Sequence, residues 1–187
     1  ILRVQLPNGI TLLSRANFNS PSLFIKGCLP AGALFDPDEK LGLADFTSSA
    51  LMRGTHQRSF QQIYDTLESA GTSLSISCGT HTASFHGRAL AEDLDMLLAL
   101  LAEVLRHPVF PAEQVERLRA QLLTALAIRA QDTGDMASLA FDQMVYKNHP
   151  YACPEDGYVE TVQAIRRDDL VEFHRQHYGP RDMLVVI

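Results

Sequence analysis

The feature that most constrains this fold is a change of hydrophobic period in the middle of the chain. From Ser73 to Cys78 polar and apolar residues alternate, which is the pattern of a half-buried strand. Gly79 makes a turn, and Thr82–Ala89 returns as the antiparallel partner. Helical spacing follows over Glu92–Arg106, where leucines repeat along one face: Leu94, Leu97, Leu98, Leu101 and Leu105. A strand pair followed by an amphipathic helix predicts a sheet with helices packed against it.

Further strands are predicted near both ends of the chain. Ile1–Leu6 and Ile10–Leu13 flank Pro7-Asn8-Gly9, and an Asn-Gly pair between apolar runs indicates a hairpin closed by a type I′ turn. Ser22–Leu29 is predicted as a third strand, and the apolar run Met183–Ile187 as the last one.

The other periodic segments are predicted helices. One lies within Gly42–Thr55, Ser59 is expected to cap the next, and Thr133-Gly134 is expected to end a long one. The remaining predicted helices are Phe60–Ser69, Glu113–Gln131, Asp135–Tyr146 and Asp168–Tyr178. The apolar stripe predicted for the long helix is Val115, Leu118, Leu122, Ala125 and Arg129. Strands come in hairpins and helices in runs, which predicts an α+β fold: an antiparallel sheet with helices mainly on one face.

Composition excludes several classes of partner. The chain has 187 residues and a net charge of −6 with no basic run, so we expect neither nucleic acid nor an anionic membrane as a partner. No apolar stretch is long enough to span a bilayer. Cys28, Cys78 and Cys153 are far apart and are interpreted as packed free thiols, which favours a reducing compartment such as the cytoplasm and leaves the compartment open.

The ends of the sequence suggest a piece of a longer polypeptide. The chain starts at Ile1 without a methionine, and it stops at Ile187 inside an apolar, β-branched run. We therefore expect residues 1–187 to form one domain of a larger protein.

The segment Gly42–Thr55 carries the positions of greatest functional interest. Asp45, Ser48 and Ser49 stand at i, i+3 and i+4, positions that helix geometry makes neighbours on one surface. Helices use this spacing to carry two metal ligands and a general base, but a carboxylate and two hydroxyls are not that set. Ser48 and Ser49 are interpreted as solvated hydroxyls, against the alternative of nucleophiles, because neither has a base nearby in the sequence.

Histidines offer a second possible metal site. His174 and His177 stand at i, i+3, which is compatible with metal binding, but no carboxylate or thiol of evident role accompanies them. We interpret them as a packed, half-exposed pair on the last helix. His81 and His86 are separated by an odd number of residues, so on one strand they point to opposite faces.

The order and spacing of several short motifs then indicate a family. These motifs are Leu6-Pro7-Asn8-Gly9-Ile10, the loop Ala31–Asp36, Gly42-Leu43-Ala44, Arg53-Gly54-Thr55, Leu67–Gly71, His149-Pro150-Tyr151, and Phe173 with Tyr178-Gly179-Pro180 and Met183–Val186. Together they cover nearly the whole chain, and it resembles a domain of the pitrilysin/insulinase-type zinc metallopeptidases, the inverzincin class.

The resemblance implies a zinc site that this chain lacks. Active members carry H-x-x-E-H on the first helix, where two histidines bind zinc and the glutamate is the general base. The matching positions here are Asp45, Ser48 and Ser49, and no carboxylate stands between Arg117 and Gln131, where the resemblance implies a third ligand. We therefore expect no catalytic residue, no metal ligand and no cofactor in this segment, with zinc only in a catalytic partner half.

Three functions follow from the resemblance and the residues. The first is a non-catalytic domain of a zinc peptidase-like protein, which forms chamber wall and contacts a peptide substrate while a catalytic half or subunit of the same family carries the zinc. The second is a structural or peptide-binding subunit of a wholly inactive homologue. The third is a different chemistry that uses Asp45 with Ser48 or Ser49. Whether the parent protein is an enzyme, and which residues bind its substrate, stay open at this point.

Overall fold

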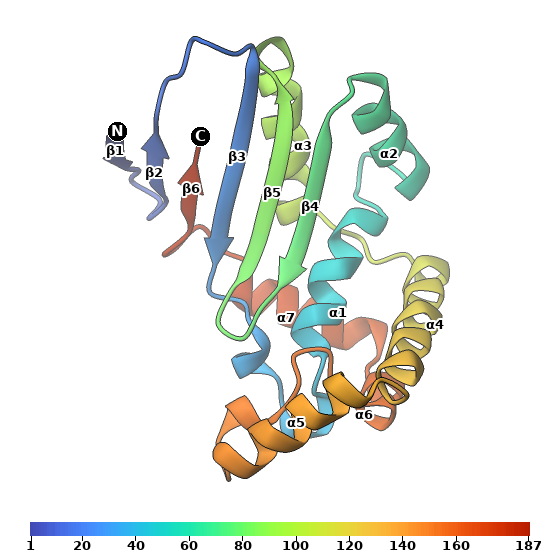
Figure 1. Cartoon of the computed structure of the whole chain (residues 1–187). Helices are drawn as coiled ribbons and strands as arrows, with labels where there is room; N and C mark the ends of the chain where they lie inside the picture. The colour runs from blue at the N-terminus through green and yellow to red at the C-terminus, as the bar shows by residue number, and fades with distance from the viewer.

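One mixed sheet forms the centre of the protein, in a computed structural model that describes all residues 1–187. Its strands lie in the order β1-β2-β6-β3-β5-β4 (Figure 1). The strands are β1 (Leu2–Gln5), β2 (Thr11–Ser14), β3 (Ser22–Leu29), β4 (Ser73–Cys78), β5 (Ala83–Leu90) and β6 (Leu184–Val186). Every neighbouring pair is antiparallel except β2 and β6, which run parallel. The predicted α+β class is confirmed. The sheet, predicted as antiparallel, has one parallel pair because the C-terminal strand lies between two strands from the start of the chain.

Seven α-helices accompany the sheet, and Figure 1 shows α2 and α3 behind it and α1, α4, α5, α6 and α7 around its lower end. The helices are α1 (Leu43–Ala50), α2 (Phe60–Ser69), α3 (Leu94–Arg106), α4 (Ala112–Arg129), α5 (Thr133–Val145), α6 (Val159–Ala164) and α7 (Arg167–His177). No helix combines the length and the apolar character needed to cross a membrane.

A single hydrophobic core lies between the sheet and the helices. Alternation on β3 and β5 turns Ile25, Leu29 and Phe85 inward, and the stripe of α3 brings Leu97 and Leu101 against them. Each such side chain stabilises the fold by about 1.5–3 kcal/mol when it is fully buried. The predicted change of hydrophobic period, from the strand pair to the helix that follows, therefore determines which face of the sheet packs against which face of α3.

The first hairpin forms as predicted, but its turn is of another type. Gly9 has φ +97°, while Asn8 is not among the residues with positive φ, as a type I′ turn would require. The Gly9 N–H donates to the Leu6 carbonyl at 3.0 Å, and the Leu6 N–H donates to the Ile10 carbonyl at 2.8 Å. These bonds close a three-residue loop in which Pro7 holds a negative φ and Gly9 alone takes the left-handed position.

Helix boundaries confirm some sequence signals and correct others. Ser59 caps α2 in a capping box with Gln62, as its position predicted. The predicted break after the long helix is confirmed, but it lies at residues 130–132. Thr133-Gly134 begins α5 instead, because the Asp132 carboxylate accepts the N–H groups of Gly134 at 2.8 Å and Asp135 at 2.9 Å. Helix α6 was not predicted; its single apolar anchor, Val162, is too little for a periodic signal.

Candidate functional site

Helix α1 is the most enclosed helix of the molecule and lies between β4, α4 and α7. Its predicted apolar face is confirmed, since Leu43, Phe46, Ala50 and the following Leu51 are all buried. The Arg119 guanidinium of α4 lies over the Phe46 ring in a cation–π contact, with its Cζ 5.2 Å from the ring centroid. Packing on three sides leaves α1 only a narrow exposed strip.

That strip carries Asp45 and Ser49, one helical turn apart and both half-buried. Ser48 does not share it: its side chain is completely buried, and its hydroxyl donates to the Asp45 backbone carbonyl at 2.9 Å. The prediction of two solvated hydroxyls is therefore wrong for Ser48, because α1 is covered on that side. A hydroxyl held by the backbone of its own helix is not poised for nucleophilic attack.

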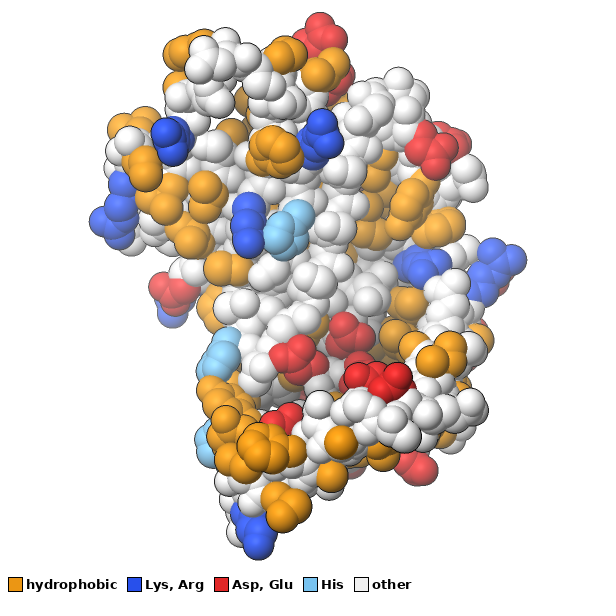
Figure 2. Space-filling model, viewed as in Figure 1, with side chains coloured by type: hydrophobic (Ala, Val, Ile, Leu, Met, Phe, Trp, Pro, Cys, Tyr) orange, Lys and Arg blue, Asp and Glu red, His pale blue; other side chains and the backbone are white.

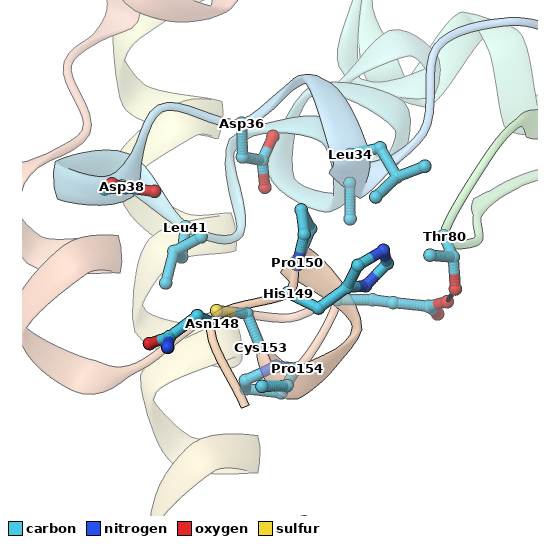
Figure 3. A pocket seen from close by; sticks show the side chains of 13 residues that line it. Leu34, Asp36, Asp38, Leu41, Thr80, Asn148, His149, Pro150, Cys153 and Pro154 are labelled. Carbon is cyan, nitrogen blue, oxygen red and sulfur yellow. Dashed lines mark hydrogen bonds between the residues drawn. The ribbon is translucent and has the colours of Figure 1, made fainter. Parts of the chain in front are cut away.

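The start of α1 is held by Asp36 from the preceding loop. Its carboxylate accepts the N–H of Gly42 and the N–H of Ala44, each at 2.8 Å. Burial raises the pKa of Asp36 to about 7, against the opposing effect of these N–H groups. Asp36 lines a cavity of about 550 Å³ together with His149, Pro150 and Thr80 (Figure 3). This side chain couples the loop before α1 to the geometry of the helix.

An acidic hollow lies beside the strip, which we define by Asp45, Asp142, Glu155 and Asp156. Figure 2 shows red side chains gathered in this hollow below the sheet. Burial, and next the charges of Asp156 and Glu155, raise the pKa of Asp45 to about 6. The acidic hollow thus places other negative charges near the Asp45 carboxylate, which is already partly removed from water.

An ion pair and two hydrogen bonds hold the loop that carries Glu155 and Asp156. Arg129 at the end of α4 pairs with Asp156 and donates to the Gly157 carbonyl at 2.8 Å. The Thr80 hydroxyl donates to Glu155. Glu155 and Asp156 therefore already have partners within the chain, and these contacts fix the shape of the acidic hollow.

The face of α4 toward α1 has no acidic side chain. Leu126 is buried there, the Arg53 guanidinium donates to Gln121 Oε1 at 2.8 Å, and the predicted stripe passes through Leu126 rather than Ala125, which is exposed. No group of three or more His, Cys, Asp or Glu side chains converges in a way that would hold a metal ion.

The histidines have separate packing partners. His174 Nε2 lies 2.9 Å from the Leu105 carbonyl oxygen, and its ring stacks on Tyr178 with centroids 5.0 Å apart. The His177 ring packs against Phe35 and Phe173 instead. Burial lowers the pKa of both histidines, as expected of packed neutral rings. The interpretation of a packed pair is confirmed.

His81 and His86 were expected to point to opposite faces of one strand, and that premise is wrong. His81 lies in the turn before β5, where its Nε2 is 2.7 Å from the Tyr151 hydroxyl, whereas His86 is exposed on β5 itself. β5 starts at Ala83, one residue after the predicted start at Thr82, so His81 lies outside the strand and the rule for strand faces does not apply to it.

Sequence reasoning missed Asp36, Glu155 and Asp156 as neighbours of α1. Asp36 lies nine residues before Asp45, and the pair Glu155–Asp156 lies in a loop more than a hundred residues later. The one local signal is Gly157, which has φ +71° and lies against the backbone of Leu41 and Gly42. A glycine beside two acidic residues in a loop is too common a pattern to reveal that approach.

Comparison with known proteins gives consistent results. A family model described as insulinase (peptidase family M16) matches residues 13–153. The chain is 24% identical over 98% of its length to an uncharacterized zinc protease of Rickettsia bellii, of which it covers 44%. It is 26% identical over 95% of its length to a protein of Helicobacter pylori described as the non-peptidase homolog YmxG, of which it covers 41%.

A solved structure shares the fold. It is the crystal structure of a peptidase M16 inactive domain from Pseudomonas fluorescens, with a TM-score of 0.91 and 24% identity, and the alignment covers 99% of this chain and 45% of that one. The chain thus spans less than half the length of these relatives.

Proposed function

This chain belongs to the insulinase family of peptidases (peptidase family M16), and on that premise we propose that it is a non-catalytic domain of a zinc-dependent peptidase-like protein. In this proposal the domain forms chamber wall and contacts the peptide, while the zinc site lies in a partner half or subunit of the same family. The observation that carries the proposal is the side-chain set on α1, where Asp45, Ser48 and Ser49 stand at the spacing of a metal-binding helix.

The residues present do not fit zinc. A catalytic zinc site takes three protein ligands, usually histidine nitrogens with a carboxylate. Asp45 is the only charged oxygen donor among the three residues. Ser48 is buried, and its hydroxyl is hydrogen-bonded to the backbone. The adjacent helix α4 has the buried, apolar Leu126 and no carboxylate in its second half. A buried serine hydroxyl also has no basic form at neutral pH that could activate water. We therefore assign these three residues as degenerate motif positions.

The chain keeps the packing of the helix although its chemistry is different. Leu43, Phe46 and Leu51 remain in the core, and Asp36 still holds the start of α1. A domain that only had to fill space would not need the acidic hollow beside α1, which stores like charges at a cost to stability. This retention supports a role in which the surface around α1 faces a ligand or a partner.

A second function is supported by one similarity. Because the chain resembles a protein described as a non-peptidase homolog, the whole parent protein could be a structural or peptide-binding subunit without any zinc site. The two functions make different predictions about the parent sequence. An H-x-x-E-H motif in the same polypeptide or in an adjacent reading frame supports the first, and its absence from both supports the second.

The direct test measures zinc and hydrolysis together. The purified protein is analysed for metal content after dialysis against zinc, and it is assayed with a mixed peptide library, alone and with the H-x-x-E-H protein of the same genome. We expect no hydrolysis that depends on Asp45, Ser48 or Ser49, and EDTA-sensitive hydrolysis only when an intact motif is present. Hydrolysis abolished by Asp45→Asn or Ser49→Ala would contradict the proposal and support a different chemistry on α1.

A further inference from the structure

The sheet face opposite the helices is open to solvent, and the strand register defines its members. Residues that pair across neighbouring strands project to the same side of the sheet. Starting from exposed Lys26, the pairing gives one cross-strand row over all six strands: Ser75, His86, Lys26, Val186, Leu13 and Arg3. We call this row and the two parallel to it, Ser73-Arg88-Phe24 and Ser77-Ser84-Cys28-Leu184-Thr11-Gln5, the open sheet face.

All formal charges of this face have one sign. It carries Arg3, Lys26 and Arg88, together with the His86 ring, and no Asp or Glu, although the chain has 22 acidic residues and a net charge of −6. These three cations are exposed, and none of them takes part in an ion pair within the chain. A cationic surface without internal partners is unusual for an acidic protein and attracts anionic groups.

The same face also offers apolar contact area. Phe24 is 63% exposed, and the Arg88 guanidinium lies over its ring, with Cζ 5.7 Å from the centroid. Leu13 and Val186 stand in the central row beside Lys26. In Figure 2 blue and pale-blue side chains are interspersed with orange ones over the sheet, whereas red ones gather below it and also lie around its margins. Exposed aromatic and aliphatic groups between cations suit a chain with carboxylate and apolar side chains.

We propose that the open sheet face binds the acidic segment of an extended peptide through Lys26, Arg88 and Arg3. This inference rests on the proposed function, in which the domain contacts the peptide, and it adds the class of peptide. The acidic hollow lies beyond the lower end of the sheet and repels carboxylates, so an acidic segment is restricted to the sheet. An arginine that already lies over Phe24 needs little reorganisation to pair with a carboxylate.

An acidic peptide fits this face better than a nucleic acid does. A duplex or long single strand carries phosphates in regular succession, and binding it requires a continuous basic path. Here the cations are separated by serines and aliphatic residues, and carboxylates lie beyond the lower end of the sheet. Individual carboxylates on a flexible peptide can reach separated cations, whereas a polyanion would also approach the hollow.

The test compares labelled peptides that differ only in charge. One sequence is prepared with its variable positions as Glu, as Gln or as Lys, and its binding to the full protein is followed by fluorescence anisotropy at low and high salt. The variants are Lys26→Glu and Arg88→Glu, and Arg117→Glu on α4 is the control, since it makes the same change in net charge on an exposed helix away from the face. Thermal unfolding checks that all three are folded.

The Glu peptide should bind more tightly than the Gln peptide, and the Lys peptide should bind most weakly to this face. Lys26→Glu and Arg88→Glu should each lower the affinity for the Glu peptide by about threefold or more. Arg117→Glu should leave that affinity nearly unchanged. High salt should remove the preference for Glu.

Four results would overturn the inference. Equal binding of the three peptides, or an equal effect of Arg117→Glu, would reject it while peptide contact, and so the proposed function, stays intact. A single-stranded oligonucleotide that binds as tightly as the Glu peptide would assign the face to nucleic acid. No binding of any peptide would reject both the inference and the peptide contact in the proposed function.

Discussion

The backbones of Gly42 and Gly157 are in contact, although the two residues are far apart in the sequence. Both have positive φ, at +93° and +71°. A Cβ on Gly157 would come within 2.1 Å of the Leu41 carbonyl oxygen, and one on Gly42 within 2.8 Å of the Asp156 carbonyl oxygen. This contact joins the start of α1 to the loop that carries Glu155 and Asp156. The acidic hollow therefore depends on two residues that have no side chain.

Gly157→Ala should destabilise the protein by about 2–4 kcal/mol, because it combines an unfavourable φ with a backbone clash. Urea unfolding measures the effect. Gly71→Ala is the control for φ alone, since Gly71 has φ +59° and nothing within 4 Å of its Cβ position, and it should cost only about 1 kcal/mol. Equal costs for the two substitutions would show that the contact between the two glycines contributes nothing.

Asp45→Asn should stabilise the protein at about pH 8 and change little at about pH 4. The pKa of Asp45 is about 6 in the folded protein and near 3.8 when unperturbed, so the folded state holds the proton more tightly. Stability from this group is fully present below the unfolded pKa and is lost as the pH rises through the folded pKa. Removing the charge should recover about 1–3 kcal/mol at the higher pH.

Urea unfolding at the two pH values measures this difference. Asp65→Asn, the same substitution at an exposed position of α2, is the control for the change of side chain itself. A stabilisation by Asp45→Asn that is the same at both pH values would exclude the charge of Asp45 as its cause.

Asp45→His combined with Ser49→His should not create a tight zinc site. The two rings would stand one turn apart on the exposed strip of α1. The second half of the adjacent α4 has no carboxylate to offer, and Glu155 and Asp156 are held by Thr80 and Arg129. Zinc would then have two protein ligands where a stable site takes three or four. Ser48 is left unchanged because a glutamate there would be buried.

The reference for this experiment is Gln61→His with Asp65→His, an exposed pair at the same spacing on α2. Isothermal titration should give similar weak affinities for the two designs. A much tighter site on α1 would mean that Glu155 or Asp156 can act as a third ligand, and Glu155→Gln in that background would identify which.

Arg58→Ala should destabilise the protein by about 1–3 kcal/mol. Glu103 on α3 is only 6% exposed, and it accepts from Arg58 and from the Thr55 hydroxyl just after α1. Removing the arginine would leave a buried carboxylate with one neutral donor, and the partial exposure of Arg58 moderates the cost. Arg117→Ala breaks the exposed pair with Glu113 and should cost less than about 0.5 kcal/mol by chemical unfolding.

The sequence alone determined the limits of those strands and helices whose signals come from neighbouring residues. The limits of β3, α2 and β4 follow from alternation, from the capping residue Ser59 and from the flanking turns, because these interactions lie within a few residues. The apolar face of α1 and the spacing of Asp45, Ser48 and Ser49 could also be predicted, since both depend only on helical geometry.

Tertiary structure decided everything that depends on long-range approach. Whether Ser48 is buried depends on β4, α4 and α7 closing over α1, and the acidic hollow depends on Gly157 meeting Gly42. The position of β6 between β2 and β3 gives the open sheet face its central row, which the order of strands along the chain does not contain. Local periodicity determines which side of an element is apolar, whereas packing in three dimensions determines which polar groups become neighbours.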